Sequence, residues 1–145
     1  MAKRYTFLLF IAVFTLGLSA QSTDVPTGRW QTLDDETGET NSIIEIYEQD
    51  GKYFGRIVEI LTDNKNALCT KCSGAKKDQP IKGLVIIENL EKSGDYWKGG
   101  TILDPKKGAD YKLSAWFENS DSETLFIRGK HWTGIYRTQT WKRKK

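Results

Sequence analysis

Histidine and cysteine are scarce in this chain, and this limits the metal and nucleophilic chemistry open to it. The sequence contains one histidine, His131, and two cysteines, Cys69 and Cys72. A structural zinc site takes four ligands, so these three residues would need a carboxylate such as Asp104 to complete one. A lone histidine in a turn segment is expected at the surface rather than in catalysis. We therefore predict no catalytic residue, no metal and no cofactor.

The chain also lacks a strong excess of charge of either sign. Its formal net charge is +3 at pH 7. The one basic cluster, residues 142–145, lies at the carboxyl end, where a run of charges is usually solvated. Proteins that bind nucleic acid typically carry a strongly basic patch or stripe. The overall charge therefore gives no indication of a nucleic-acid partner.

A long apolar run occurs at the start of the chain. Lys3 and Arg4 precede an uncharged stretch at residues 5–18, and the small residues Ser19 and Ala20 follow it. This is the order of a secretory signal peptide, and the run is short for a membrane-spanning helix. We predict a signal peptide at residues 1–20 and an exported domain at residues 21–145. That domain would be periplasmic or secreted, with no stable membrane insertion after cleavage.

Helical periodicity is missing from residues 21–145, and alternation of apolar and polar residues takes its place. Asp50-Gly51 marks a tight hairpin because both residues tolerate a positive φ. Short apolar-rich segments recur between such turns, at residues 28–32, 42–48, 53–61, 83–90, 96–103, 111–117, 124–129 and 135–142. This spacing predicts an all-β fold, a single small antiparallel up-and-down barrel of about eight strands. Such a barrel is either filled by side chains or wide enough for one small ligand.

The first and last expected strands carry a matching pair of motifs. Gly28-Arg29-Trp30 lies in the first strand, and Arg137, Trp141 and Arg143 lie in the last. This pairing resembles the calycin superfamily, which includes lipocalins, fatty-acid-binding proteins and avidins. The resemblance implies that Trp30 closes one barrel end beneath a cation, with Arg143 as first choice and Arg137 as second. A guanidinium suits this role because it stacks on an indole while donating to nearby carbonyls.

Further motifs carry a narrower resemblance. They are Cys69-x-x-Cys72-x-Gly74, Trp97-x-Gly99-Gly100-x-Ile102-Leu103-Asp104-Pro105 and Arg137-Thr138-Gln139-Thr140-Trp141-x-Arg143. Together they resemble the bacterial secreted family filed as domain of unknown function 2147, over nearly all of residues 28–143. The resemblance implies a secreted lipocalin-like barrel and carries no established activity.

Cys69 and Cys72 form the sharpest local constellation. An exported, oxidising setting favours a disulfide, which would stabilise the fold by about 2 kcal/mol at most. Its expected task is to rigidify the long polar loop at residues 62–82, near the barrel mouth. Two alternatives are a metal site and a redox-active pair, whose thiolate Lys71, Lys76 and Lys77 would favour. No βαβ context places the pair at a helix N-terminus.

Strand alternation also hints at an internal polar cluster. Three arginines share strand faces with apolar or aromatic residues: Arg56 with Phe54, Arg128 with Phe126, and Arg137 with Trp141. If these faces point inward, the arginines need an acidic partner (Glu45, Glu59 or Glu88) or an anionic ligand. If the faces point outward, the cluster does not exist. Alternation alone does not decide between the two.

The leading functional prediction is a non-enzymatic barrel that binds a small apolar or amphipathic ligand. The candidate ligand contacts are Phe54, Arg56, Trp97, Tyr111 and Trp116. One alternative is an envelope or surface interaction module with a filled barrel, acting through loops that include the Cys69–Cys72 segment. A third is a periplasmic thiol-redox protein that uses the two cysteines.

Overall fold

The computed structural model describes residues 24–33 and 37–145, and the predicted signal peptide lies outside them. The described chain is almost entirely β-structure, with one short 3₁₀ helix, η1 (Gly74–Lys76). The strands are β1 (Gly28–Leu33), β2 (Thr40–Gln49), β3 (Lys52–Ile60), β4 (Val85–Ser93), β5 (Tyr96–Asp104), β6 (Ala109–Trp116), β7 (Thr124–Lys130) and β8 (Tyr136–Lys144). No helix in the described ranges has the length and apolar character needed to cross a bilayer.

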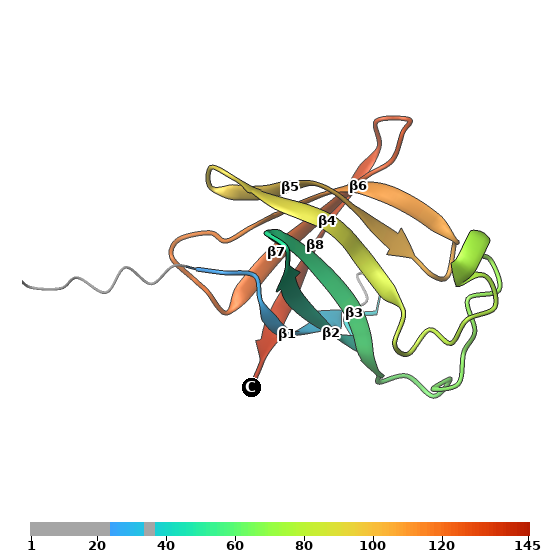
Figure 1. The fold of residues 1–145 in the computed structure, drawn as a ribbon. Coiled ribbons are helices and arrows are strands. Elements are labelled where there is room, and N and C mark those ends of the chain that lie inside the picture. Colours follow the sequence, from blue (N-terminus) through green and yellow to red (C-terminus); the bar gives the residue numbers. More distant parts are fainter. Residues whose placement is uncertain (1–23, 34–36) are drawn as a thin grey trace, which may run out of the picture.

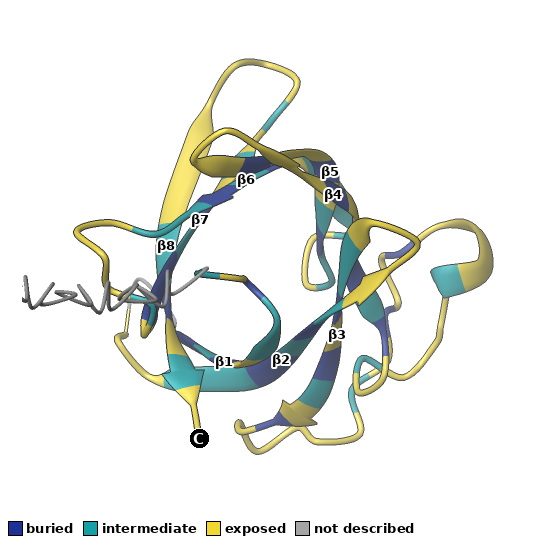
Figure 2. Cartoon of the chain, turned by 60° about the vertical axis from the view of Figure 1, so that its left-hand side comes forward, coloured by how far each residue is buried: buried dark blue, intermediate teal, exposed yellow. Residues whose placement is uncertain are grey.

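The eight strands close into one antiparallel barrel, which confirms the predicted fold class. Each strand pairs with the next in sequence, and β8 pairs back onto β1, with Trp30 opposite Arg143. Figure 2 looks along this ring of strands. Closure removes the free sheet edges that would otherwise invite aggregation.

Local sequence explains why the strands turn where they do. Asp50 and Gly51 have φ values of 52° and 76°, as a two-residue hairpin requires, and Gln49 pairs with Lys52 across the turn. On β2, Ile44 and Ile46 are each 1% exposed and point into the barrel, as their alternation predicted. The hairpins therefore follow from turn residues and apolar alternation together.

Strict alternation fails on β3. Val58 is an extra residue there, because Ile57 and Glu59 pair with consecutive residues of β2. This β-bulge reverses which side chains face inward, so both Ile57 and Ile60 line the interior although they lie three positions apart. Regular alternation would put Ile60 on the same face as Arg56, and the bulge moves it to the opposite face.

Up-and-down topology gives the barrel two distinct ends. The closed end holds the start of β1 and the β2–β3, β4–β5 and β6–β7 turns. The open end holds the β3–β4, β5–β6 and β7–β8 connections. In Figure 1 the long β3–β4 connection with η1 lies beside the β5–β6 turn, opposite the first described residues.

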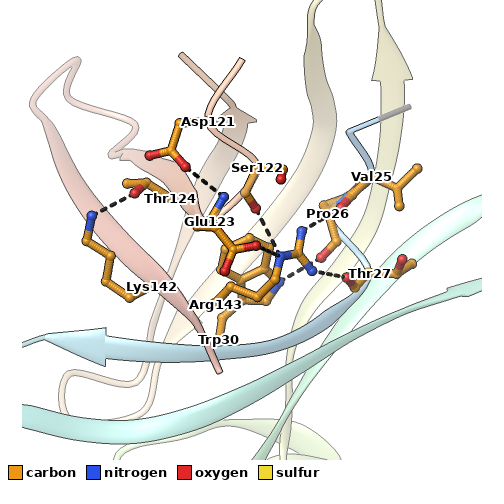
Figure 3. A network of polar contacts seen from close by, with 10 residues as sticks. All are labelled: Val25, Pro26, Thr27, Trp30, Asp121, Ser122, Glu123, Thr124, Lys142 and Arg143. Carbon is orange, nitrogen blue, oxygen red and sulfur yellow. Dashed lines mark hydrogen bonds and ion pairs between the residues drawn. The ribbon is translucent and has the colours of Figure 1, made fainter. Parts of the chain in front are cut away.

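Arg143 seals the closed end. Its Cζ lies 4.2 Å from the centre of the Trp30 ring. Its guanidinium donates to the backbone oxygens of Ser122, Thr27 and Val25 at 2.9, 2.9 and 3.2 Å (Figure 3). One side chain therefore ties together the β6–β7 turn, the segment before β1 and the end of β8. Arg137, the second choice for this position, lies at the opposite end of β8.

The Gly-x-Trp motif is explained by the same arrangement. Trp30 is fully buried, and its Nε1 donates to Pro26 O at 2.7 Å. Gly28 has a φ of 121°, and a Cβ there would lie only 2.9 Å from Arg143 Nη1. Glycine at this position thus allows both the backbone conformation and the close approach of the guanidinium.

Candidate functional site

A cavity of about 650 Å³ opens at the open end of the barrel. Its volume lies within the range of small-molecule binding sites, about 300–1,000 Å³. The larger hollow of the barrel therefore lies at the open end. At the other end Arg143 covers Trp30, and a smaller hollow of about 460 Å³ lies beside Trp97 and Phe117. Trp141 of β8, which is 2% exposed, lines the cavity, whereas Trp30 does not.

The inner wall of the cavity is apolar. It is formed mainly by five isoleucines from β2, β3, β4 and β7, which are Ile44, Ile57, Ile60, Ile86 and Ile127. Trp141 of β8 completes it. Each of these isoleucines is less than 9% exposed overall. An isoleucine side chain is a hydrocarbon and carries no hydrogen-bond donor or acceptor. This wall suits a hydrocarbon surface and offers nothing to a polar one.

The rim of the cavity is polar, and most of its charged residues are positive. Lys106, Lys107 and Arg137 line it, with His131 at the start of the β7–β8 connection. Among the described lining residues, Asp104 is the one acid. The cavity thus grades from an apolar floor to a cationic mouth.

Asp104 organises the β5–β6 turn. Its Oδ1 accepts the backbone N–H groups of Lys106 and Lys107 at 2.9 and 3.3 Å. Its backbone oxygen accepts the N–H of Gly108 at 2.8 Å. The carboxylate therefore hydrogen-bonds within the turn and fixes the backbone positions of Lys106 and Lys107.

The Cys69–Cys72 segment packs directly on this turn. The two cysteines form a disulfide, and they are 0% and 5% exposed. Cys69 Sγ lies 3.5 Å from Pro105 O. Gly108 has a φ of 64°, and a Cβ there would overlap the Lys71 carbonyl. The long β3–β4 loop thus supports the rim of the cavity from outside.

The disulfide weighs against thiol chemistry. Thiol–disulfide exchange requires an attacking thiolate to reach a sulfur, and both cysteines are buried. The described residues contain no free cysteine and no cluster of three or more His, Cys, Asp or Glu residues placed to bind a metal. The ring centre of His131 lies 5.7 Å from that of Tyr111, and His131 Nδ1 forms a hydrogen bond with Thr133 Oγ1.

Two of the predicted ligand contacts lie inside the barrel, but only one faces the cavity. Tyr111 lines the cavity beside the rim. Trp97 is 2% exposed and packs at the closed end, with its ring 5.6 Å from that of Phe117. Trp97 is therefore part of the seal, and the aromatic pattern alone could not separate the two ends.

Phe54, Arg56 and Trp116 lie away from the cavity, which corrects their assignment as ligand contacts. Arg56 forms an ion pair with Glu45 at 2.6 Å, and its side chain is 51% exposed. The alternate residues of these strands, such as Ala115, turn inward instead. The three side chains face outward because inward positions on β3 and β6 fall one residue away.

The three arginines do not form one internal cluster. Arg128 Nε donates to Thr138 Oγ1 at 2.9 Å, and its guanidinium lies 4.9 Å from the Trp116 ring centre on the outer face. Arg56 also faces outward, whereas Arg137 lines the cavity. Of the three arginine-bearing strand faces, only the face of Arg137 points into the barrel.

Sequence reasoning missed most of the residues that shape the cavity. The isoleucines of its wall were visible as alternating apolar residues, but several strands carry such residues. Lys106 and Lys107 were not predicted as rim residues. The predicted up-and-down order contained a usable signal, because it puts the β5–β6 turn at the same end as the β7–β8 connection.

The fold and the cavity define the class: a small lipocalin-like barrel. A solved structure with this fold is protein HP1028 from the human pathogen Helicobacter pylori, described as belonging to the lipocalin family. It matches with a TM-score of 0.70 and 23% sequence identity, over 82% of each chain. At this identity the likeness shows the fold alone.

The chain itself belongs to a bacterial family, described as uncharacterized proteins conserved in bacteria (DUF2147). The family match covers residues 28–143 and confirms the resemblance found in the motifs. No curated protein matches the chain.

Proposed function

We propose that this protein is an exported, non-enzymatic binding protein that holds one small apolar or amphipathic molecule in its barrel. The observation that carries the proposal is the cavity of about 650 Å³, with its apolar wall and polar mouth. An eight-stranded barrel can also be filled by side chains, and the open volume favours the container over the filled barrel. Fold alone does not define function, so the proposal rests on the cavity.

Export is supported by two features. Residues 1–20 have the order of a signal peptide. The Cys69–Cys72 disulfide is a bond that persists in oxidising compartments and is rare in the cytosol. The expected compartment is the periplasm or the extracellular medium.

The affinity should depend on how much hydrocarbon the wall removes from water. Each buried methylene contributes about 0.8 kcal/mol, or about a fourfold change in Kd. A homologous series of alkyl ligands should therefore bind more tightly with each added carbon, until the tail outgrows the cavity. An affinity that does not change with chain length would contradict an apolar container.

A cavity-filling variant tests the proposal directly. Ile102 lines the cavity and Thr101 beside it is exposed, so Ile102→Trp and Thr101→Trp form a matched pair on β5. The affinity for an environment-sensitive apolar dye should fall at least about tenfold in Ile102→Trp, because the indole occupies the volume that the dye needs. Thr101→Trp should bind like the wild type. Equal binding by both variants, or no binding by the wild type, would sink the proposal.

The β7–β8 connection favours a second candidate function, docking on a lipid surface. Trp132, Ile135 and Tyr136 are 86%, 75% and 61% exposed, respectively. Trp and Tyr are favoured at the bilayer interface, and Ile135 and Tyr136 also line the cavity mouth. This surface would set the mouth against the membrane.

Co-sedimentation with phosphatidylcholine–phosphatidylglycerol vesicles tests the second candidate. Trp132→Ser with Ile135→Ser should reduce vesicle binding without a change in thermal stability, because both side chains are exposed. Val25→Ser, which removes an exposed apolar side chain at the closed end, is the control. Unchanged binding in the double variant, or equal loss in the control, would reject it.

A further inference from the structure

Lys106 and Lys107 differ from Lys76 and Lys77 of the neighbouring β3–β4 connection in having no ion pair within the described chain. Lys76 forms an ion pair with Glu88 at 2.6 Å, and Lys77 forms one with Asp78 at 3.7 Å. Across residues 24–33 and 37–145, neither Lys106 nor Lys107 has an ion-pair partner. Both are exposed, and both line the cavity mouth. Their charges are thus available to something that enters the cavity.

The acid nearest in sequence does not neutralise them. Asp104 Oδ1 accepts the backbone N–H groups of Lys106 and Lys107, so its oxygen is directed at the turn rather than at the ammonium groups. An Asp that accepts N–H groups two and three residues later fixes the turn locally. The hydrogen bonds to Asp104 therefore fix the turn backbone, and they do not involve the ammonium groups of the two lysines.

The Cys69–Cys72 loop holds this turn from behind. Gly108 fits directly against the Lys71 backbone, and Cys69 Sγ lies 3.5 Å from Pro105 O. The disulfide closes a very short loop, so its main effect is to hold that loop in one shape. The buried disulfide therefore has a role here, which is to position a turn that carries two lysines.

We propose that the mouth selects an anionic head group, with Lys106 and Lys107 as the recognising pair and the ligand's apolar tail against the isoleucine wall. The ligand class is an anionic amphiphile, an alkyl carboxylate or alkyl phosphate. This inference rests on the proposed function, because without a tail in the cavity the lysines would be only a surface charge pair. A lysine ammonium meets either head group as a compact point charge, and it does not distinguish their shapes.

The expected effect is modest because the lysines are exposed. Each solvent-exposed ion pair contributes a small free energy, so two together should give about a three- to tenfold preference over a neutral head. Salt screens exposed pairs, so the preference should shrink as ionic strength rises from about 0.05 M to 0.5 M.

The test compares head groups on one fixed alkyl chain: the carboxylate, the phosphate and the neutral alcohol. Kd values are measured by dye displacement for the wild type and for Lys106→Gln with Lys107→Gln. The control is Lys112→Gln with Lys130→Gln, which makes the same charge change at two exposed lysines that are paired across β6 and β7 and do not line the cavity. The first double variant should lose the anion preference and keep its affinity for the alcohol, and the control should keep both.

The outcomes separate this inference from the proposed function. Failure of all three ligands to bind the wild type would reject the proposed function. Binding of the alcohol as tightly as the carboxylate and phosphate would reject the anionic head while leaving the container intact. An anion preference that persists in Lys106→Gln with Lys107→Gln would reject the lysine pair. A preference for one anion over the other, lost in that variant, supports the inference and identifies the head group.

Discussion

The two ends of the barrel use cations in opposite ways. At the closed end, the guanidinium of Arg143 donates to the backbone oxygens of Val25, Thr27 and Ser122 and stacks on the face of Trp30. At the open end, Lys106 extends from a turn whose backbone is satisfied by other groups. Satisfied groups stabilise the fold and are unavailable to a ligand. The contrast assigns stability to the closed end, and under our proposal the open end serves recognition.

The largest expected effect comes from breaking the closed end. Arg143→Ala removes three hydrogen bonds from a charged donor and uncovers Trp30, which should lower the free energy of unfolding by about 3 kcal/mol. Urea denaturation measures the change. Lys144→Ala, at a neighbouring exposed position on β8, should stay within about 0.5 kcal/mol of the wild type.

The folded fraction of Arg143→Ala should bind an apolar dye with unchanged affinity, because the residue does not line the cavity. A variant that keeps full stability would show that the seal is not a stabilising feature. A variant that keeps its stability but loses dye binding would reverse the division between the ends.

A smaller effect should follow from loosening the open end. Cys69→Ala with Cys72→Ala removes the disulfide, and the chain-entropy relation for so short a loop gives a loss of about 2 kcal/mol. The wild type treated with a reductant under denaturing conditions and refolded in it provides an independent comparison. In both, we expect the preference for an anionic head group to fall more than the affinity for a neutral alcohol. An equal fall in the two affinities would mean that the disulfide supports the whole barrel and not the rim.

The smallest effect concerns acid stability at the closed end. The pKa of Asp121 is lowered below 3.8, chiefly by a hydrogen bond with the Thr124 side chain and also by the Glu123 N–H, which donates at 2.8 Å (Figure 3). A lowered folded-state pKa stabilises the fold at pH values above the unfolded pKa. That contribution is lost as the pH falls through the folded-state pKa.

Asp121→Asn should therefore melt slightly below the wild type at neutral pH, with the gap closing below about pH 4. Thermal melts from neutral to strongly acidic pH measure this. Asp95→Asn, in the β4–β5 turn of the same end, is the control. A gap that stays constant down to the lowest pH would show that the carboxylate charge plays no part.

Much of the fold could be predicted because local signals were consistent. Asp50-Gly51 specified a hairpin, and the Ile44–Ile46 alternation specified an inward face. These features depend on neighbours in sequence, so they need no knowledge of the rest of the chain.

The candidate site was harder to predict for a physical reason. Alternation defines two faces but not which one is inside, and a bulge at Val58 exchanges them along one strand. Regular alternation puts Arg56 on the same face as Ile60, and it leaves open whether that face points inward. Trp97 was correctly expected inside the barrel, but its height along the barrel axis separates a seal residue from a ligand contact.

The sequence by itself determined the number of strands, the hairpin turns and membership of the family, because each is encoded in short motifs and local alternation. Only the tertiary structure decided which end holds the larger hollow, which cations are satisfied and which are free. Those properties depend on the register of closure and on side chains that meet from strands far apart in the chain, as Arg143 meets Thr27.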